Sequence, residues 1–238
     1  MYSMKDKIVL ITGGSQGYGK AMAKRFVEGG ATVIIAAKNL GKLEAAKQET
    51  GCAELFSMDV TSPADWERVK KFIEEKYGRL DVLINNAGGG VAIKEVTEQS
   101  IEEIDTAIKL NLNSVIYGSR AFAEMMKTQK SGTILNVSSV CAKEAWSAWS
   151  VYASAKSGVL NFSKGLYVEL RPYNVRVTTL IPAAANTGFN GSAGIGEVPR
   201  LLKPEDIAEL TYDICKMPNH VVVEEITIWG IDQEVNPL

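Results

Sequence analysis

The chain has 238 residues, of which 46% are hydrophobic and 23% are charged, close to the averages of soluble globular domains. This composition excludes a disordered or collagen-like chain and predicts one domain over residues 1–238. With 26 basic and 28 acidic residues, the net charge of −2 gives no electrostatic signature of a protein that binds nucleic acid or an anionic membrane.

Histidine and cysteine are too few for several classes of site. His220 is the only histidine, which argues against a Ser-His-Asp hydrolase and against a zinc site built from several histidines. Cys52, Cys141 and Cys215 form no CxxC pair and are expected to be buried thiols in a reducing cytosol. No apolar run reaches the roughly 20 residues of a membrane helix, and the first strand begins too early to leave room for a targeting segment. We expect a cytoplasmic protein without a metal.

Short apolar runs alternate with longer amphipathic segments along the chain. The runs are rich in Val and Ile and apolar on both alternations, which is typical of strands buried on both faces of a parallel sheet. The predicted strands are 7–12, 31–37, 53–58, 81–85, 133–138, 174–181 and 225–229. The predicted helices are 19–28, 40–49, 63–77, 100–126, 150–170 and 204–216. This order predicts a single doubly wound α/β (Rossmann) domain with a parallel sheet of about seven strands and helices on both faces.

Residues 183–203 interrupt this alternation. The stretch is rich in glycine and follows a strand, at the edge where a doubly wound fold binds its ligand. Compact domains rarely leave about 20 residues without regular structure. We therefore expect a lid over a substrate, and the alternative is an ordinary surface loop.

A glycine-rich turn, TGGSQGYG at residues 12–19, joins the first predicted strand to the first predicted helix. The first N–H groups of a helix have no partners within it, and with the helix dipole they favour a bound phosphate. Gly13, Gly17 and Gly19 suit such a turn, because its backbone takes positive φ and side chains would block a pyrophosphate. We expect a dinucleotide here, against the alternative of a tight turn without a ligand.

The TGxxxGxG spacing resembles the fingerprint of the short-chain dehydrogenase/reductase family. Other motifs of that family follow in order along almost the whole chain. They are Asp59-Val60, Asn85-Asn86-Ala87-Gly88, Asn111, Ser139 and Tyr152-Ala-Ser-Ala-Lys156. The resemblance implies a catalytic set of Asn111, Ser139, Tyr152 and Lys156.

The predicted cofactor site draws on the same motifs and on the end of the second strand. It comprises Gly13, Ser15, Gln16, Gly17, Tyr18, Gly19, Lys38, Asp59, Val60, Asn86, Ala87, Gly88, Tyr152, Lys156, Pro182 and Thr187. Two of these positions depart from the family pattern. Tyr18 occupies a place that is more often aliphatic, and Pro182 is followed by Ala183 where the family has glycine.

The Tyr152/Lys156 pair supplies the acid–base chemistry that hydride transfer to a carbonyl requires. A phenol with its ordinary pKa of about 10 is a poor acid or base at neutral pH. Lys156, one helical turn away, is expected to stabilise the phenolate and lower this pKa. Ser139 precedes Tyr152 by 13 residues, at the carboxyl end of a predicted strand, where open α/β sheets bind ligands. By resemblance, Ser139 bonds the substrate oxygen, Lys156 holds the nicotinamide ribose, and Asn111 positions a water at a helix irregularity.

A second Tyr-xxx-Lys pair, Tyr212 and Lys216, lies in the last predicted helix. Residues four apart share a helix face whatever their function. Pro199 stands where a serine partner of Tyr212 would lie, and it has no hydroxyl group. We therefore interpret this second pair as a solvated helix face. The alternative for the first pair is that it has no catalytic role, with Tyr152 a core tyrosine and Lys156 a surface lysine beside it.

The end of the second strand bears on the choice of nicotinamide cofactor. Rossmann enzymes that use NAD place an acidic residue there to bond the ribose 2′-hydroxyl. Ala37 stands at that position and Lys38 follows, a combination that suits a 2′-phosphate. One charge-assisted contact contributes about 1.5–3 kcal/mol, or roughly 10- to 100-fold in affinity. We predict NADP(H), with NAD(H) as the alternative if Lys38 is an ordinary surface lysine.

The sequence thus predicts an oxidoreductase that transfers a hydride between NADP(H) and a carbonyl or secondary alcohol, with Tyr152 as general acid/base. Trp146, Trp149 and Phe189 favour an apolar or flat carbonyl compound, and 3-oxoacyl thioesters are common substrates in the family. One alternative is an idle NAD(P)-binding sensor or regulator. Another is a Rossmann-type methyltransferase, which usually has a carboxylate after the second strand, where this chain has Ala37. The resemblance implies a homotetramer or homodimer with helix 150–171 at an interface.

Overall fold

A computed structural model describes residues 3–185 and 201–233. Seven parallel strands form one sheet in the order β3-β2-β1-β4-β5-β6-β7. They are β1 (Ile8–Thr12), β2 (Thr32–Ala37), β3 (Glu54–Ser57), β4 (Val82–Asn85), β5 (Gly132–Val137), β6 (Val175–Pro182) and β7 (Glu225–Ile228). The predicted α/β fold class is confirmed, and every strand begins and ends within one residue of its predicted range.

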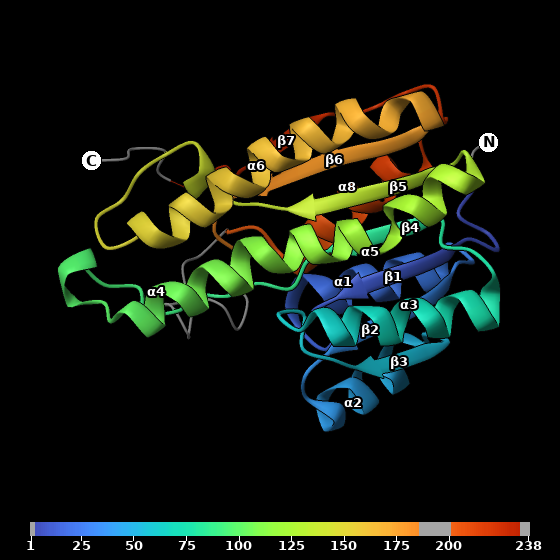
Figure 1. The fold of residues 1–238 in the computed structure, drawn as a ribbon, viewed down its shortest axis with the longest axis horizontal. Coiled ribbons are helices and arrows are strands. Elements are labelled where there is room, and N and C mark those ends of the chain that lie inside the picture. Colours follow the sequence, from blue (N-terminus) through green and yellow to red (C-terminus); the bar gives the residue numbers. More distant parts are fainter. Residues whose placement is uncertain (1–2, 186–200, 234–238) are drawn as a thin grey trace.

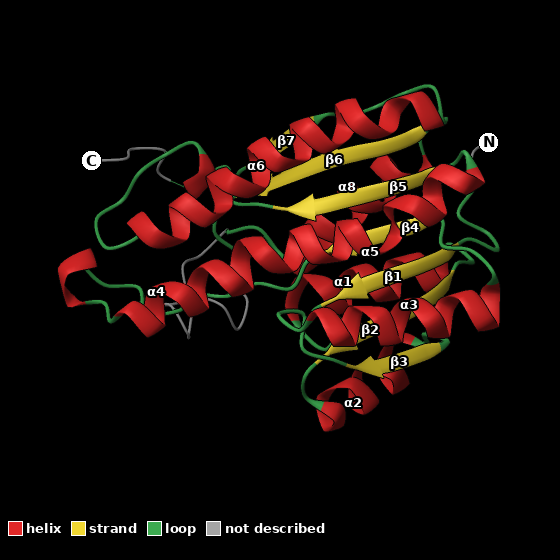
Figure 2. Ribbon diagram, viewed as in Figure 1, coloured by secondary structure: helices red, strands yellow, loops and turns green. Residues whose placement is uncertain are grey.

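Helices cover both faces of the sheet (Figures 1 and 2). One face packs against α1 (Gly17–Glu28), α2 (Leu40–Thr50) and α8 (Pro204–Lys216). The other packs against α3 (Pro63–Tyr77), α5 (Ser114–Gln129) and α6 (Ser150–Leu170). The apolar sequence of β1 is explained by its burial on both faces of the sheet. Val9 and Ile11 belong to the first core, whereas Ile8 and Leu10 belong to the second.

The long helix predicted over residues 100–126 is divided into three parts. The helix α4 (Ile101–Ile108) begins with a capping box in which Ser100 and Glu103 bond each other's backbone N–H groups. A π-helical turn, η2 (Lys109–Asn113), follows and leads into α5. The helical stretch predicted over 100–126 is thus present, extends to Gln129, and contains at Asn111 the helix irregularity that the resemblance implied.

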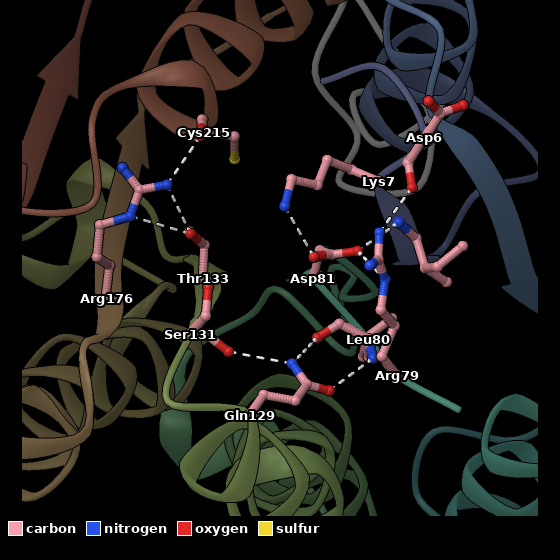
Figure 3. A network of polar contacts seen from close by, with 11 residues as sticks. Asp6, Lys7, Arg79, Leu80, Asp81, Gln129, Ser131, Thr133, Arg176 and Cys215 are labelled. Carbon is pink, nitrogen blue, oxygen red and sulfur yellow. Dashed lines mark hydrogen bonds and ion pairs between the residues drawn. The ribbon is translucent and has the colours of Figure 1, made fainter. Parts of the chain in front are cut away.

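The amino edge of the sheet is held by polar side chains (Figure 3). The Arg176 guanidinium donates to Thr133 Oγ1 and to the backbone oxygens of Cys215 and Met217, the last two at 2.8 Å. The Asp81 carboxylate pairs with Lys7 and Arg79, each at 3.1 Å. The Arg176 contacts tie β5 and β6 to the end of α8, and the Asp81 pairs join the segments that lead into β1 and β4. The opposite, carboxyl edge of the sheet is the one toward which the strand arrowheads point in Figure 2.

Most of the predicted lid, residues 186–200, lies outside the described residues. Its two described ends lie side by side, because Ala185 and Leu202 pair in a parallel β-bridge. Ala183 does not take a positive φ, and its N–H donates to Ile228 O at 2.9 Å. Alanine therefore fits the place where the family has glycine. Within the described part of the chain, no helix is long and apolar enough to cross a membrane.

Candidate active site

A cavity of about 690 Å³ opens at the carboxyl edge of the sheet. Its walls come from the glycine-rich turn, the segments that follow β2, β4, β5 and β6, and the first turns of α6. This volume is in the range of sites that bind a cofactor or a drug-sized ligand. Most residues of the predicted cofactor site line this cavity: Gly13, Ser15, Gln16, Gly17, Tyr18, Lys38, Val60, Asn86, Ala87, Gly88, Tyr152, Lys156 and Pro182.

Three predicted residues do not line the described cavity. Gly19 is buried inside the turn, where a methyl group would collide with the Gly13 carbonyl oxygen. Asp59 forms other contacts, described below. Thr187, like Phe189 of the expected substrate contacts, lies outside the described residues.

The glycine-rich turn directs the start of α1 into the cavity. Gly13 and Gly17 have φ values of +67° and +53°, in the left-handed region that other residues rarely adopt. Gln16 is the N-cap of α1, and its side chain does not cap the helix. The first N–H groups of α1 consequently keep their capacity to bind an anion, as the sequence predicts for a pyrophosphate.

The loop after β4 joins the glycine-rich turn to the centre of the cavity. Thr12 Oγ1 accepts hydrogen bonds from the N–H groups of Asn86 and Ala87, each at 3.0 Å. The Asn86 side chain donates to Thr12 O at 2.9 Å. A methyl group placed on Gly88 would lie 3.0 Å from Asn111 Oδ1 and 3.3 Å from Lys156 Nζ. Glycine at this position therefore lets the loop approach both side chains closely.

Asn111 lies behind the cavity wall and is fully buried. Its Oδ1 accepts the Gly89 N–H at 3.0 Å, and its Nδ2 donates to Gly89 O at 3.0 Å and to Ala107 O at 3.1 Å. The side chain thus fixes the loop after β4 against the π-helical turn. We found no direct bond between Asn111 and Lys156 among the described contacts.

Ser139, Tyr152 and Lys156 meet at one end of the cavity. Ser139 follows β5, and its hydroxyl oxygen accepts the N–H of Cys141 at 3.2 Å. Tyr152 and Lys156 lie on one face of α6 and are 8% and 4% exposed. The Lys156 ammonium donates to Val137 O at 3.0 Å and lies 5.7 Å from the centre of the Tyr152 ring. The structure therefore brings these three predicted residues together.

Burial shifts the pKa of both groups on α6 in the direction that favours the uncharged form. It raises the pKa of the Tyr152 phenol well above its ordinary range, and an interaction with Ser139 only partly opposes this effect. It lowers the pKa of Lys156 to about 8. The expected lowering of the tyrosine pKa is thus wrong for this structure. Burial is the main cause of the raised pKa, and the Lys156 ammonium donates to the Val137 carbonyl and not to the phenol.

The other end of the cavity carries two lysines. Lys38 Nζ pairs with Asp59 Oδ2 at 2.8 Å. Burial tends to raise the pKa of Asp59, but the Lys38 ammonium and hydrogen bonds from Thr61 outweigh it and lower this pKa. Lys42 lines the cavity as well, and its Nζ donates to Gln16 Oε1 at 3.1 Å. The position where NAD-binding folds place an acidic residue is occupied by Ala37, which also lines the cavity.

Sequence reasoning missed Lys42. A signal was present, because a lysine in the first turn of α2 opposes the helix dipole and therefore needs another reason to be there. Cys141 was predicted only as a buried thiol; it is buried, as are Cys52 and Cys215, but it also lines the cavity. Leu110 and Gln233 are further lining residues that no motif indicated.

The second Tyr-xxx-Lys pair lies away from this cavity. Its interpretation as a solvated face was wrong for Tyr212, which is buried between α1 and α8. The ring lies edge-on to Phe26, with centroids 5.4 Å apart, and the Arg25 guanidinium stacks on it at 3.6 Å. Lys216 pairs with Asp213 at 2.7 Å.

Comparisons with known proteins give one consistent result. Residues 7–197 match the family model described as short chain dehydrogenase. An uncharacterized oxidoreductase of Staphylococcus aureus (strain N315) is 30% identical over 230 residues, which cover 96% of this chain and 99% of that protein.

Solved structures agree with this match. An alcohol dehydrogenase from the archaeon Thermococcus sibiricus, complexed with 5-hydroxy-NADP, is 30% identical with a TM-score of 0.88 and covers 98% of this chain and 100% of its own. A 3-ketoacyl-(acyl-carrier-protein) reductase from Brucella melitensis, complexed with NADH, is 30% identical with a TM-score of 0.90, over 96% and 99% of the two chains.

Proposed function

The chain belongs to the short-chain dehydrogenase family of oxidoreductases, and from that premise we propose that it transfers a hydride between NADP(H) and a carbonyl or secondary alcohol. The observation that carries the proposal is the meeting of Ser139, Tyr152 and Lys156 in the cavity onto which the glycine-rich turn opens. The residues fit the cofactor, since the turn offers N–H groups for phosphates and Lys38 and Lys42 offer positive charge. When bound, the reduced nicotinamide supplies the hydride.

The roles of the side chains follow from their positions. The Tyr152 phenol carries its proton at neutral pH, and the alkoxide that develops during carbonyl reduction is a strong enough base to take that proton even from a phenol of raised pKa. We assign this role of general acid to Tyr152, with the hydroxyl of Ser139 orienting the carbonyl oxygen. Lys156, which is charged below its pKa of about 8, stabilises the negative charge that develops during this proton transfer. Asn111 is a positioning residue, because it holds the loop at Gly89 through three hydrogen bonds.

The preference for NADP(H) rests on the residues after β2. Lys38 and Lys42 line the cavity there. Among the described lining residues no acidic side chain is present to bond the ribose 2′-hydroxyl, as one does in NAD-binding folds. Lys38 already has a counter-ion in Asp59, so of these two lysines Lys42 is the one with only a neutral partner among the described contacts. In the coordinates of the Brucella reductase the bound cofactor is NADH, so NAD(H) stays the alternative.

Ala37→Asp tests this preference. A carboxylate at Ala37 repels a 2′-phosphate and accepts a bond from a 2′-hydroxyl, so the ratio of NADPH to NADH affinity is expected to fall by roughly 10- to 100-fold. The measurement is fluorescence titration of both cofactors. Thr128→Asp, at an exposed position of α5 that does not line the cavity, should leave the ratio unchanged. An unaltered ratio in Ala37→Asp would mean that the 2′-group of the cofactor ribose does not lie beside Ala37.

The proposed reaction is tested by titrating the purified protein with NADPH and NADH and following cofactor oxidation with a panel of ketones and aldehydes. We expect tight NADPH binding and turnover of at least one carbonyl compound. Binding without turnover across the panel would favour an idle NAD(P)-binding sensor. Binding of neither cofactor would contradict the assignment of the glycine-rich turn.

Four further properties stay predictions from the sequence. They are a single domain, a cytoplasmic location, a small-molecule partner and a homotetramer or homodimer.

A further inference from the structure

The two ends of the cavity differ in chemistry. Among the described lining residues there is no Asp, Glu, Arg or His. Lys38 and Lys42 lie after β2, and the third cation, Lys156, is buried beneath Tyr152. The lining around Tyr152 and Ser139 is instead aromatic and aliphatic, and it comprises Tyr18, Val140, Cys141, Trp146, Trp149 and the alanines 183–185.

We propose that Tyr18, Trp146 and Trp149 form an aromatic wall that selects an uncharged substrate with a flat apolar group, such as an aryl ring, attached to the carbonyl carbon. This inference rests on the proposed function, because it concerns the substrate of the same reaction. A flat ring gains contact area and offset or edge-on ring contacts against such a wall. A carboxylate beside the carbonyl would lose its hydration there and find no described cation other than Lys156.

Trp149 lies against the ring of Tyr152. Its ring and that of Tyr152 meet edge-on, with centroids 5.4 Å apart and an angle of 78° between their planes. The indole of Trp149 is only partly buried although it lines the cavity. Part of its surface is therefore open to a ligand that approaches Tyr152.

The backbone fixes Trp146 and Trp149 relative to each other. The Trp149 N–H donates to Trp146 O at 3.3 Å, so residues 146–149 form a tight turn. Ala148 within this turn has a φ of +69°, a conformation that glycine adopts without cost and alanine does not. Strain of this kind is retained only where the surrounding structure over-determines it, and such positions cluster at functional sites. The turn thus fixes the backbone positions from which the two indoles extend.

Tyr18 adds the third aromatic side chain, from the glycine-rich turn at the start of α1. It packs against the same core cluster as Trp146. Tyr18 and Tyr152 both line the cavity, and the phenol of Tyr18 makes a small contribution to the raised pKa of Tyr152. Burial raises the pKa of Tyr18 itself, so at neutral pH it is an uncharged part of the wall.

The test compares three ketones with the holoenzyme: acetophenone, which has an uncharged aryl group, benzoylformate, which has the same ring and a carboxylate, and butanone, which has no ring. We expect kcat/KM to be about 10²-fold higher for acetophenone than for benzoylformate. In Trp149→Leu the ratio of kcat/KM for acetophenone to that for butanone is expected to fall about 10-fold. Tyr173→Ile, at an aromatic residue that is 41% exposed and does not line the cavity, should keep the wild-type ratio.

Calorimetric titration of the NADP⁺ complex with acetophenone and benzoylformate gives a readout without turnover. Tighter binding of acetophenone, weakened in Trp149→Leu, supports the wall even if no ketone is reduced. Preference for benzoylformate, or an unchanged ratio in Trp149→Leu, overturns the wall and leaves the proposed reaction intact. If NADPH binds and every ketone fails as a substrate, the proposed reaction is contradicted, and the titration alone decides on the wall.

Discussion

Replacement of Tyr152 by phenylalanine is expected to lower kcat for carbonyl reduction by about 10²- to 10⁴-fold. The variant keeps the aromatic ring, which is 8% exposed and packs edge-on against Trp149, but it lacks the only proton that this side chain can donate. Because the ring fills the same space, we expect little change in NADPH affinity. Stopped-flow measurement of hydride transfer, together with a cofactor titration, checks both expectations.

The chain offers a matched control for this variant. Tyr212→Phe removes the same hydroxyl from a tyrosine that is 7% exposed and is followed four residues later by a lysine, but that lies on α8 away from the cavity. Its turnover should equal that of the wild type. Near-normal turnover in Tyr152→Phe would rule out this phenol as the proton donor, and equal losses in both variants would indicate a structural effect.

Lys156→Met is expected to have two opposite effects. Activity should fall by about 10²-fold or more, because the variant lacks the cation beside the reacting phenol. Stability at pH 7 should rise by about 1–3 kcal/mol, because burial opposes the charge of this lysine and methionine has no charge to desolvate. The difference between the ordinary pKa of 10.5 and the value of about 8 in the folded protein corresponds to about 3 kcal/mol. Urea unfolding measures the second effect.

The same pKa sets the pH window of that effect. Below pH 8 both the folded and the unfolded chain carry the charged lysine, so the full cost of burying it is present. As pH rises from about 8 to 10.5 the folded chain loses this proton first, so the unfolded chain binds more protons and the free energy of unfolding increases. Lys156→Met should lack this increase.

Lys164→Met serves as the control on the same helix. Its side chain is 45% exposed and pairs with Glu225 at 3.2 Å, so its removal should bring no gain in stability. A loss of stability in Lys156→Met would mean that the hydrogen bond to Val137 O outweighs the desolvation of the ammonium.

The sheet and the glycine-rich turn were predictable from the sequence because their signals are local. Strands of a sheet covered on both faces are nearly continuously apolar, and β1, which is buried at every position, is apolar from Ile8 to Ile11. Positive φ at Gly13 and Gly17 likewise belongs to single residues. The positions of Ser139, Tyr152 and Lys156 also follow from the sequence, since the carboxyl end of β5 and the first turns of α6 must lie at one edge of a parallel sheet.

Only the tertiary structure decided the charges and contacts between segments that are distant in the sequence. Lys42 reaches Gln16, Lys38 is held by Asp59, and Tyr212 is buried against Phe26, and each of these contacts crosses between elements. The raised pKa of Tyr152 depends mainly on the burial that other segments impose, so the lysine four residues away does not by itself predict the direction of the shift. Sequence spacing states which groups can meet, whereas desolvation, which sets their protonation, depends on everything packed around them.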